Sequence, residues 1–145
     1  KEAVLEAAVQ CDVVLMAAAV ADFRPAQTAT HKIKKGGGGL VLQLEPTGDI
    51  LLALAGMRQS GRMPRLVVGF AAESQDLLTN AAKKLAAKKL DLIVANDISA
   101  TDAGFGVDTN RVTLLYADGR REELPLQSKA EVAEELVQRV VILLK

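Results

Sequence analysis

The sequence contains very little cysteine and histidine. It has one cysteine and one histidine among 145 residues, which excludes an intramolecular disulfide, a cysteine-rich zinc site and a site built from several histidines. No apolar run reaches the roughly 18 residues that can span a bilayer, and no signal-peptide pattern opens the chain. These absences favour a cytoplasmic protein in a reducing compartment.

A net charge is also lacking, because 18 lysine and arginine residues balance 18 aspartate and glutamate residues. No global field therefore attracts nucleic acid or an anionic membrane, so any anion must be bound by a local cluster. Hydrophobic residues make up 50% of the chain, enough for one sizeable core at this length. We expect one globular domain over residues 1–145, with local cationic patches as the places to look for a binding site.

Apolar runs alternate with helical patterns over most of the chain. Strands are predicted over residues 12–20, 40–44, 66–70 and 90–95, the first of them covered on both faces. Helices are predicted over residues 1–9, from 47 to about 57, from a cap at Ser74 or Asp76 to about Lys89, and from a capping box of Ser128 and Glu131 onward. This alternation predicts an α/β fold with a doubly wound, mostly parallel sheet.

The pattern changes after Arg111. Residues 112–116 and 120–124 predict an antiparallel hairpin around the turn Asp118-Gly119. The open edges of such a hairpin need a cover, and pairing with another subunit would provide one.

Charged residues follow the first predicted strand. Asp22 comes just after it, at the edge where open α/β sheets bind ligands, although an aspartate there can also simply cap a turn. Residues 26–39 contain His31-Lys-Ile-Lys-Lys35 and four glycines, which predicts a mobile flap. A charge run in such a loop is more often only a solvated surface.

Lys84 and Lys88 are four residues apart and therefore project from one face of a predicted helix. Two like charges at that spacing repel by a few tenths of a kcal/mol, and a bound anion would reverse that cost. The alternative is a solvated helical face, for which Lys83 and Lys89 are the better members.

Several motifs occur in a fixed order along nearly the whole chain. They are Ala-Ala-Val-Ala-Asp22-Phe-Arg, Lys32-Ile-Lys-Lys35, Gly48-Asp-Ile-Leu51, Gly69-Phe-Ala-Ala-Glu73 and Lys88-Lys-Leu-Asp-Leu-Ile-Val-Ala-Asn96-Asp97. Together they resemble bacterial phosphopantothenoylcysteine synthetase, the synthetase domain of the bifunctional coenzyme A biosynthesis flavoprotein. The resemblance implies a Rossmann-like phosphopantothenate–cysteine ligase domain that forms a homodimer.

The resemblance also implies the chemistry. CTP activates the carboxylate of 4'-phosphopantothenate as an acyl-cytidylate with loss of pyrophosphate, and the amine of cysteine then displaces CMP. Magnesium (Mg²⁺) is required, and FMN belongs to a fused decarboxylase domain outside this chain, whose presence would give a higher assembly.

Site residues follow from the matched motifs. The resemblance implies that Lys32 on the flap is catalytic, because a cation there can neutralise charge on the phosphate and on the activated carboxylate. The residues that it implies for CTP binding are Asp22, Lys32, Gly48, Asp49, Ile50, Leu51, Phe70, Lys84 and Lys88. Asn96, Asp97, Phe105 and Asn110 are expected to support them, and no metal ligand is assigned.

Two of these assignments have ordinary structural alternatives. Thr47-Gly-Asp also reads as a plain helix-opening sequence, although free backbone N–H groups there suit an anion. Phe70 would otherwise be a core phenylalanine, whereas the family packs it against the nucleotide.

Two other functions remain as alternatives. A dinucleotide-dependent oxidoreductase fits the sheet, but no Gly-x-Gly-x-x-Gly follows a strand in this sequence. The family's upstream glycine-rich phosphate loop and its asparagine would precede Lys1, so we expect an N-terminally incomplete ligase domain. A non-catalytic nucleotide-binding or dimerisation fragment is the second alternative.

Overall fold

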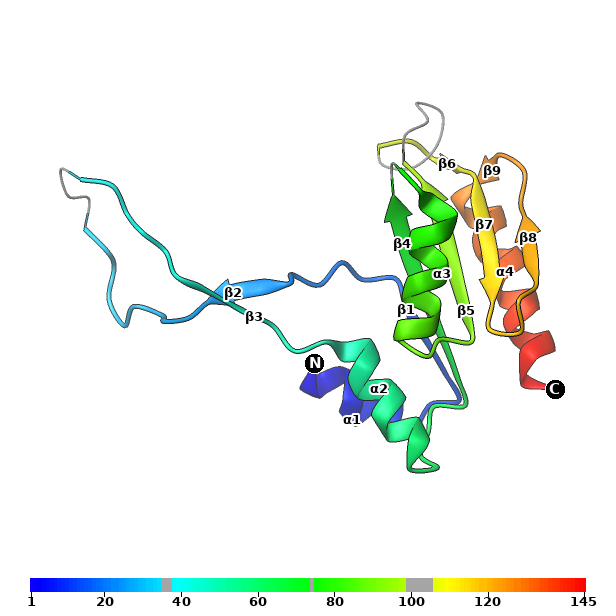
Figure 1. The fold of residues 1–145 in the computed structure, drawn as a ribbon, viewed down its shortest axis with the longest axis horizontal. Coiled ribbons are helices and arrows are strands. Elements are labelled where there is room, and N and C mark those ends of the chain that lie inside the picture. Colours follow the sequence, from blue (N-terminus) through cyan, green and yellow to red (C-terminus); the bar gives the residue numbers. More distant parts are fainter. Residues whose placement is uncertain (35–37, 74, 99–105) are drawn as a thin grey trace.

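The chain forms a layered α/β body from which a long arm extends (Figure 1). The structure is a computed structural model that describes residues 1–34, 38–73, 75–98 and 106–145. Its elements are α1 (Glu2–Ala8), β1 (Val13–Met16), β2 (Phe23–Pro25), β3 (Leu44–Pro46), α2 (Ile50–Gln59), β4 (Leu66–Glu73), α3 (Leu77–Ala87), β5 (Leu92–Asp97), β6 (Thr109–Asn110), β7 (Val112–Tyr116), β8 (Arg121–Glu123), β9 (Gln127–Ser128) and α4 (Lys129–Leu144).

The body is built on a five-stranded sheet in the order β1-β4-β5-β7-β8. The β1, β4 and β5 strands are parallel, whereas β7 and β8 join them as an antiparallel hairpin. The predicted α/β class, with a parallel core and a hairpin near the C-terminus, is confirmed. The hairpin forms, but its turn is one residue longer than the predicted Asp118-Gly119. The N–H of Gly119 bonds to Tyr116 O at 3.0 Å, so Ala117 and Asp118 are the central residues and Gly119 follows them with a φ of +89° that suits glycine.

Helices cover both faces of this sheet (Figure 1). On one face Val67 and Ile93 of the central strands pack with apolar residues of α1, α2 and α3. On the other face Val68 and Leu92 pack with the inward side of α4. The alternation of neighbouring residues between two buried faces explains why β4 and β5 read as continuous apolar runs.

Two strand predictions are wrong in extent. The run 12–20 gives only β1, which has one neighbour at the edge of the sheet, so Leu15 is 45% exposed rather than covered. The run 40–44 gives only the first residue of β3, and Val41 is 94% exposed. In β1 the core layers bury the run only in part, through Val13, Val14 and Met16. Residues 40–44 are exposed, and the described chain provides no layer to bury them.

The helix starts agree with the sequence except at one cap. The Ser128–Glu131 capping box at α4 is complete, with both reciprocal bonds formed. Asp76 precedes α3 but makes no side-chain cap and has a φ of +49°. The other predicted cap for that helix, Ser74, lies outside the described residues.

The arm is formed by the residues between β1 and α2. The β2 and β3 strands pair with each other, Phe23 opposite Pro46, and form no part of the main sheet. Beyond this ribbon the chain continues away from the sheet and returns (Figure 1). The predicted flap, residues 26–39, lies on the arm, apart from Lys35 to Gly37, which are outside the described residues. Among the described helices, none has the length and apolar character needed to cross a membrane.

Candidate functional site

A cavity of about 590 Å³ opens at the carboxyl ends of the parallel strands. Its wall comes from the end of β1 and the loop after it, the start of α2, the ends of β4 and β5, and one face of α3. This is the position at which open α/β sheets bind ligands. Its volume lies within the range of about 300–1,000 Å³ that is typical of small-molecule sites.

The structure brings eight of the nine residues implied for CTP binding to this cavity. They are Asp22, Gly48, Asp49, Ile50, Leu51, Phe70, Lys84 and Lys88. They come from four separate parts of the chain, and the fold brings these parts together. Their role in binding a nucleotide remains a prediction.

Lys84 and Lys88 both reach the cavity from α3, as their spacing predicts. The ammonium group of Lys84 donates to Phe70 O at 3.2 Å, and that of Lys88 is ion-paired with Asp49. Lys83 and Lys89 are exposed. The protein thus holds two cations on the cavity wall and leaves the other two in solvent.

Asp49 begins α2 and gives the cavity wall its polar corner. Its Oδ1 accepts the N–H of Leu52 at 3.0 Å, which caps the helix. Burial alone would raise the pKa of Asp49, but hydrogen bonds from Lys88 and from the helix N–H groups hold it below its usual value. The Asp49 carboxylate therefore already occupies the start of α2. Fewer backbone N–H groups remain free there for a ligand than the sequence suggests.

Two apolar residues of the site differ in what they can present. Ile50 is 7% exposed and packs into the core with α1 and α3, so only its backbone can serve a ligand. Phe70 is half-buried, packs against the α4 side of the core and also lines the cavity. Its ring is thus both a core residue and a wall of the site.

At the base of the arm, hydrogen bonds join the loop after β1 to the segment before α2 on the cavity wall. Thr47 donates its N–H to Asp22 O at 2.8 Å and its hydroxyl to Ala21 O at 2.6 Å. These bonds hold Asp22, at the end of the first loop, close to the start of α2. The exposed carboxylate of Asp22 lies on the cavity wall.

Asn96 is a polar group of the site that the sequence ranks only as a supporting residue. It ends β5 on the cavity wall, and its Oδ1 is buried without a hydrogen-bond partner among the described residues. A buried acceptor of this kind is costly unless a ligand or water satisfies it. Asn110 also lines the cavity, whereas Phe105 lies outside the described residues.

Lys32, the predicted catalytic residue, does not line the cavity of its own chain. It is exposed and lies on the arm beyond β2, which extends away from the sheet (Figure 1). The sequence gives no sign of this separation, because a flap can fold in either direction. Among the described residues no cluster of three or more His, Cys, Asp or Glu side chains could hold a metal ion.

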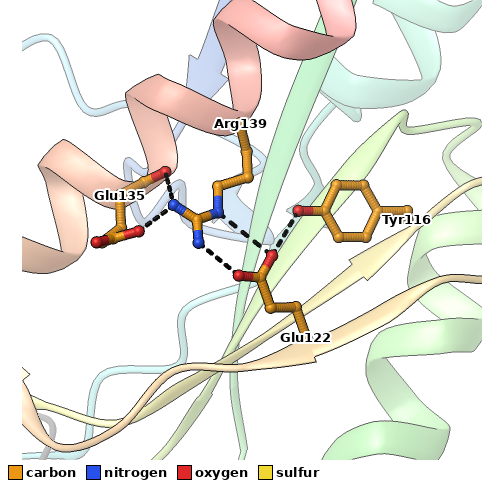
Figure 2. A network of polar contacts seen from close by, with 4 residues as sticks. All are labelled: Tyr116, Glu122, Glu135 and Arg139. Carbon is orange, nitrogen blue, oxygen red and sulfur yellow. Dashed lines mark hydrogen bonds and ion pairs between the residues drawn. The ribbon is translucent and has the colours of Figure 1, made fainter.

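A second polar cluster lies at the opposite end of the sheet, where β7 ends beside the start of β5. Figure 2 shows Arg139 of α4 between two carboxylates, Glu122 of β8 and Glu135 of its own helix. The hydroxyl of Tyr116 donates to Glu122 at 3.1 Å, and the guanidinium of Arg120 covers the Tyr116 ring at 4.4 Å.

The charges of this cluster are mutually satisfied. Hydrogen bonds from Arg139 hold the pKa of Glu122 below its usual value, and burial together with Glu122 raises the pKa of Tyr116. The cluster fastens α4 to the hairpin, and we assign it a structural role.

Comparisons with known proteins agree with this geometry. The family model described as the DNA/pantothenate metabolism flavoprotein C-terminal domain matches residues 1–143. The coenzyme A biosynthesis bifunctional protein CoaBC of Bacillus subtilis (strain 168) is 49% identical over 145 residues, which are 100% of this chain and 35% of that protein. The CoaBC protein of Mycobacterium tuberculosis (strain H37Rv) is 43% identical over 150 residues, covering 99% of this chain and 36% of that protein.

A solved structure supports the same relationship. The crystal structure of the C-terminal domain of a CoaBC protein has a TM-score of 0.76 and 36% sequence identity, and the match covers 99% of this chain and 60% of that one. The chain thus spans about a third of the length of the bifunctional relatives. With a family match over residues 1–143, the chain belongs to the DNA/pantothenate metabolism flavoprotein C-terminal domain family.

Proposed function

We propose that the protein carrying this chain is a phosphopantothenate–cysteine ligase that uses CTP. The observation that carries the proposal is the cavity at the carboxyl ends of the parallel strands, where Lys84 and Lys88 meet Asp22 and Phe70. Support also comes from relatives named as coenzyme A biosynthesis bifunctional proteins, one of them 49% identical over the whole chain.

The cavity suits a nucleoside triphosphate in charge and shape. Two ammonium groups on α3 can each form charge-assisted hydrogen bonds with phosphate oxygens. The half-buried ring of Phe70 offers an apolar surface for a base or a ribose. A ribose hydroxyl can donate to the exposed carboxylate of Asp22.

In the proposed reaction these residues bind and orient. The carboxylate of 4'-phosphopantothenate attacks the α-phosphorus of CTP and pyrophosphate leaves. The neutral amine of cysteine then attacks the acyl carbon, CMP leaves, and the nitrogen gives up one proton to solvent. Lysines placed on the phosphates would stabilise the charge that grows as pyrophosphate departs. The unpartnered Oδ1 of Asn96 can accept a hydrogen bond from a substrate N–H.

Magnesium fits this site through the nucleotide rather than through a cage of side chains. Mg²⁺ usually binds substrate phosphates and one or two carboxylates, and it would shield the charge of the triphosphate. Asp22 is the cavity carboxylate that suits this role, as the alternative to a ribose contact, because Asp49 is already paired with Lys88.

We infer that the active form is a homodimer joined through the arm. The arm and its base carry exposed apolar side chains that a second copy would cover: Val20, Phe23, Ile33, Leu40, Val41, Leu42 and Leu44. The hairpin edge is a weaker candidate, since β8 presents the exposed charges of Arg121 and Glu123. A dimer of this kind would let the arm of one subunit bring Lys32 to the cavity of the other.

Turnover by the complete protein tests the proposal. With CTP, 4'-phosphopantothenate and cysteine, we expect one pyrophosphate released for each amide formed, and no product without CTP. Calorimetry with CTP alone distinguishes the alternative of a non-catalytic nucleotide-binding module, which would bind CTP without turnover. A protein that neither binds CTP nor forms the amide would refute both readings.

A further inference from the structure

Asp49 holds two partners at once from the start of α2. Its Oδ1 accepts the N–H of Leu52 at 3.0 Å, while its Oδ2 is ion-paired with Lys88 on α3. The Lys88 side chain is 24% exposed and that of Asp49 is 35% exposed. One carboxylate therefore caps one helix and restrains a cation on the next.

Among the described residues, the charged side chains on the cavity wall balance one another. Asp22 and Asp49 carry two negative charges, and Lys84 and Lys88 carry two positive charges. This described part of the wall is therefore neutral before a ligand enters, rather than a preformed trap for anions. A polyanion can use Lys88 fully only after the ammonium group leaves Asp49.

The position of this ion pair distinguishes it from the structural pairs of the fold. Asp91 makes a similar double contact, with Arg58 at 2.8 Å and with the N–H of Val67 at 2.7 Å, but it lies at the opposite end of the sheet. Within the part of the chain that the structure describes, Asp49–Lys88 is the ion pair whose two partners both line the cavity.

We propose that Asp49 is the resident counter-ion of Lys88, and that the phosphates of the nucleotide replace it on that lysine when they bind. The inference rests on the proposed nucleotide site and gives the Asp49 side chain a role other than ligand contact. Its bond to Leu52 can persist in both states, so the exchange moves Lys88 and leaves the start of α2 in place. The carboxylate thus weakens nucleotide binding by competing for the cation.

The test is Asp49→Asn in the complete protein. Asparagine caps helices as well as aspartate does, so α2 keeps its start while Lys88 loses its competitor. We expect CTP to bind roughly two- to fivefold more tightly by calorimetry, the range that a partly exposed ion pair supports. Asp49→Ser, which also caps, should act in the same direction.

Asp118→Asn is the matched control. Asp118 also uses one oxygen for a backbone N–H, that of Arg120 at 3.0 Å, and the other for an ion pair, with the Arg120 side chain at 2.7 Å. It does not line the cavity, so the affinity for CTP should stay at the wild-type value. An unchanged or weakened affinity in both Asp49 variants, with thermal unfolding showing that they fold, would overturn the inference.

A double-mutant cycle with Lys88→Met tests the exchange itself. The gain from Asp49→Asn should shrink in this background, because no lysine remains to be released. An equal gain in both backgrounds would mean that Asp49 acts by general repulsion, which contradicts the exchange. If the wild-type protein does not bind CTP, the proposed function fails too; if it binds CTP and only the Asp49 variants fail to respond, this inference alone falls.

Discussion

At the scale of single residues, the site depends on which lysines in and just after α3 point into the cavity. Lys84 and Lys88 face the cavity, and Lys83 and Lys89 face solvent, although all four belong to one short stretch of sequence. Helical geometry separates Lys84 from Lys83, because residues four apart share a face and neighbours do not. Lys89 lies past Lys88, the C-cap of α3, where the backbone leaves the helix with a φ of +51°. The chain therefore offers its own control for any substitution at the site.

Lys84→Met is expected to weaken CTP binding about tenfold, since a hydrogen bond to a charged group contributes about 1.5–3 kcal/mol. Lys83→Met removes the same charge from the exposed side of the helix and should leave the affinity unchanged. Calorimetry measures both variants, and thermal unfolding checks that both fold. An equal loss in the two variants would mean that general charge, not position, attracts the nucleotide.

Some features of the site can be predicted from the sequence and others cannot. The spacing of Lys84 and Lys88 is enough to put them on one face, and the cavity contains them both. Two features of the site cannot be predicted in this way, because each depends on contacts between segments that are distant in the sequence. The first is the pair of Asp49 with Lys88, and the second is the buried Oδ1 of Asn96, which has no hydrogen-bond partner within the described part of the chain. A residue type and its neighbours do not reveal which tertiary partner is present or missing.

At the scale of elements, α4 is fastened at both ends. The capping box of Ser128 and Glu131 fixes its start, while Arg139 near its end joins Glu122 on β8 (Figure 2). The capping box is visible in the sequence because its members are three residues apart. The Arg139 contact spans 17 residues and depends on the hairpin returning beside the helix.

Glu122→Gln is expected to destabilise the fold by about 1 kcal/mol near neutral pH, a value kept low because the carboxylate is partly exposed. The folded pKa of Glu122 lies below its usual value of 4.5, so the folded state binds fewer protons there. The wild type should lose this contribution as the pH falls below about 4.5. Urea unfolding at pH 7 and at pH 3.5 measures the difference, which should narrow at the lower pH.

Glu123→Gln is the neighbouring control for that experiment. Glu123 is exposed, and among the described residues its ion pair is with Arg121 on the same strand. Its loss should therefore change the free energy of unfolding little at either pH. A constant difference between wild type and the Glu122 variant across the pH range would contradict the assigned role of the carboxylate.

At the scale of the whole molecule, the arm is the part that sequence reasoning describes least well. The flap composition is visible in the sequence, and so is the apolar run at 40–44, which reads as a strand. The main sheet does not take up that run, and Leu40 and Val41 stay exposed. Apolar periodicity shows that a segment needs a partner, but it does not show whether the partner belongs to the same chain.

Lys32→Gln is expected to slow pyrophosphate release about 100-fold, because one preorganised cation is lost from the developing charge. The affinity for CTP should change much less, since Lys32 lies outside the cavity that holds the other predicted contacts. Single-turnover kinetics separates the two effects. Release at the wild-type rate would remove Lys32 from its assigned role.

Mixing two inactive variants decides whether the arm acts on its own subunit or on the partner. Lys32→Gln has an intact cavity and a defective arm. The double variant Lys84→Met/Lys88→Met, assayed at a CTP concentration far below its Kd, has the reverse, so a dimer of one of each holds one complete site only if the arm serves the partner. Random exchange in an equal mixture makes half of the dimers mixed, each with one of two sites active, so activity should recover to about a quarter of wild type. If each arm serves its own subunit, no combination restores a site, and the mixture should stay as inactive as its components.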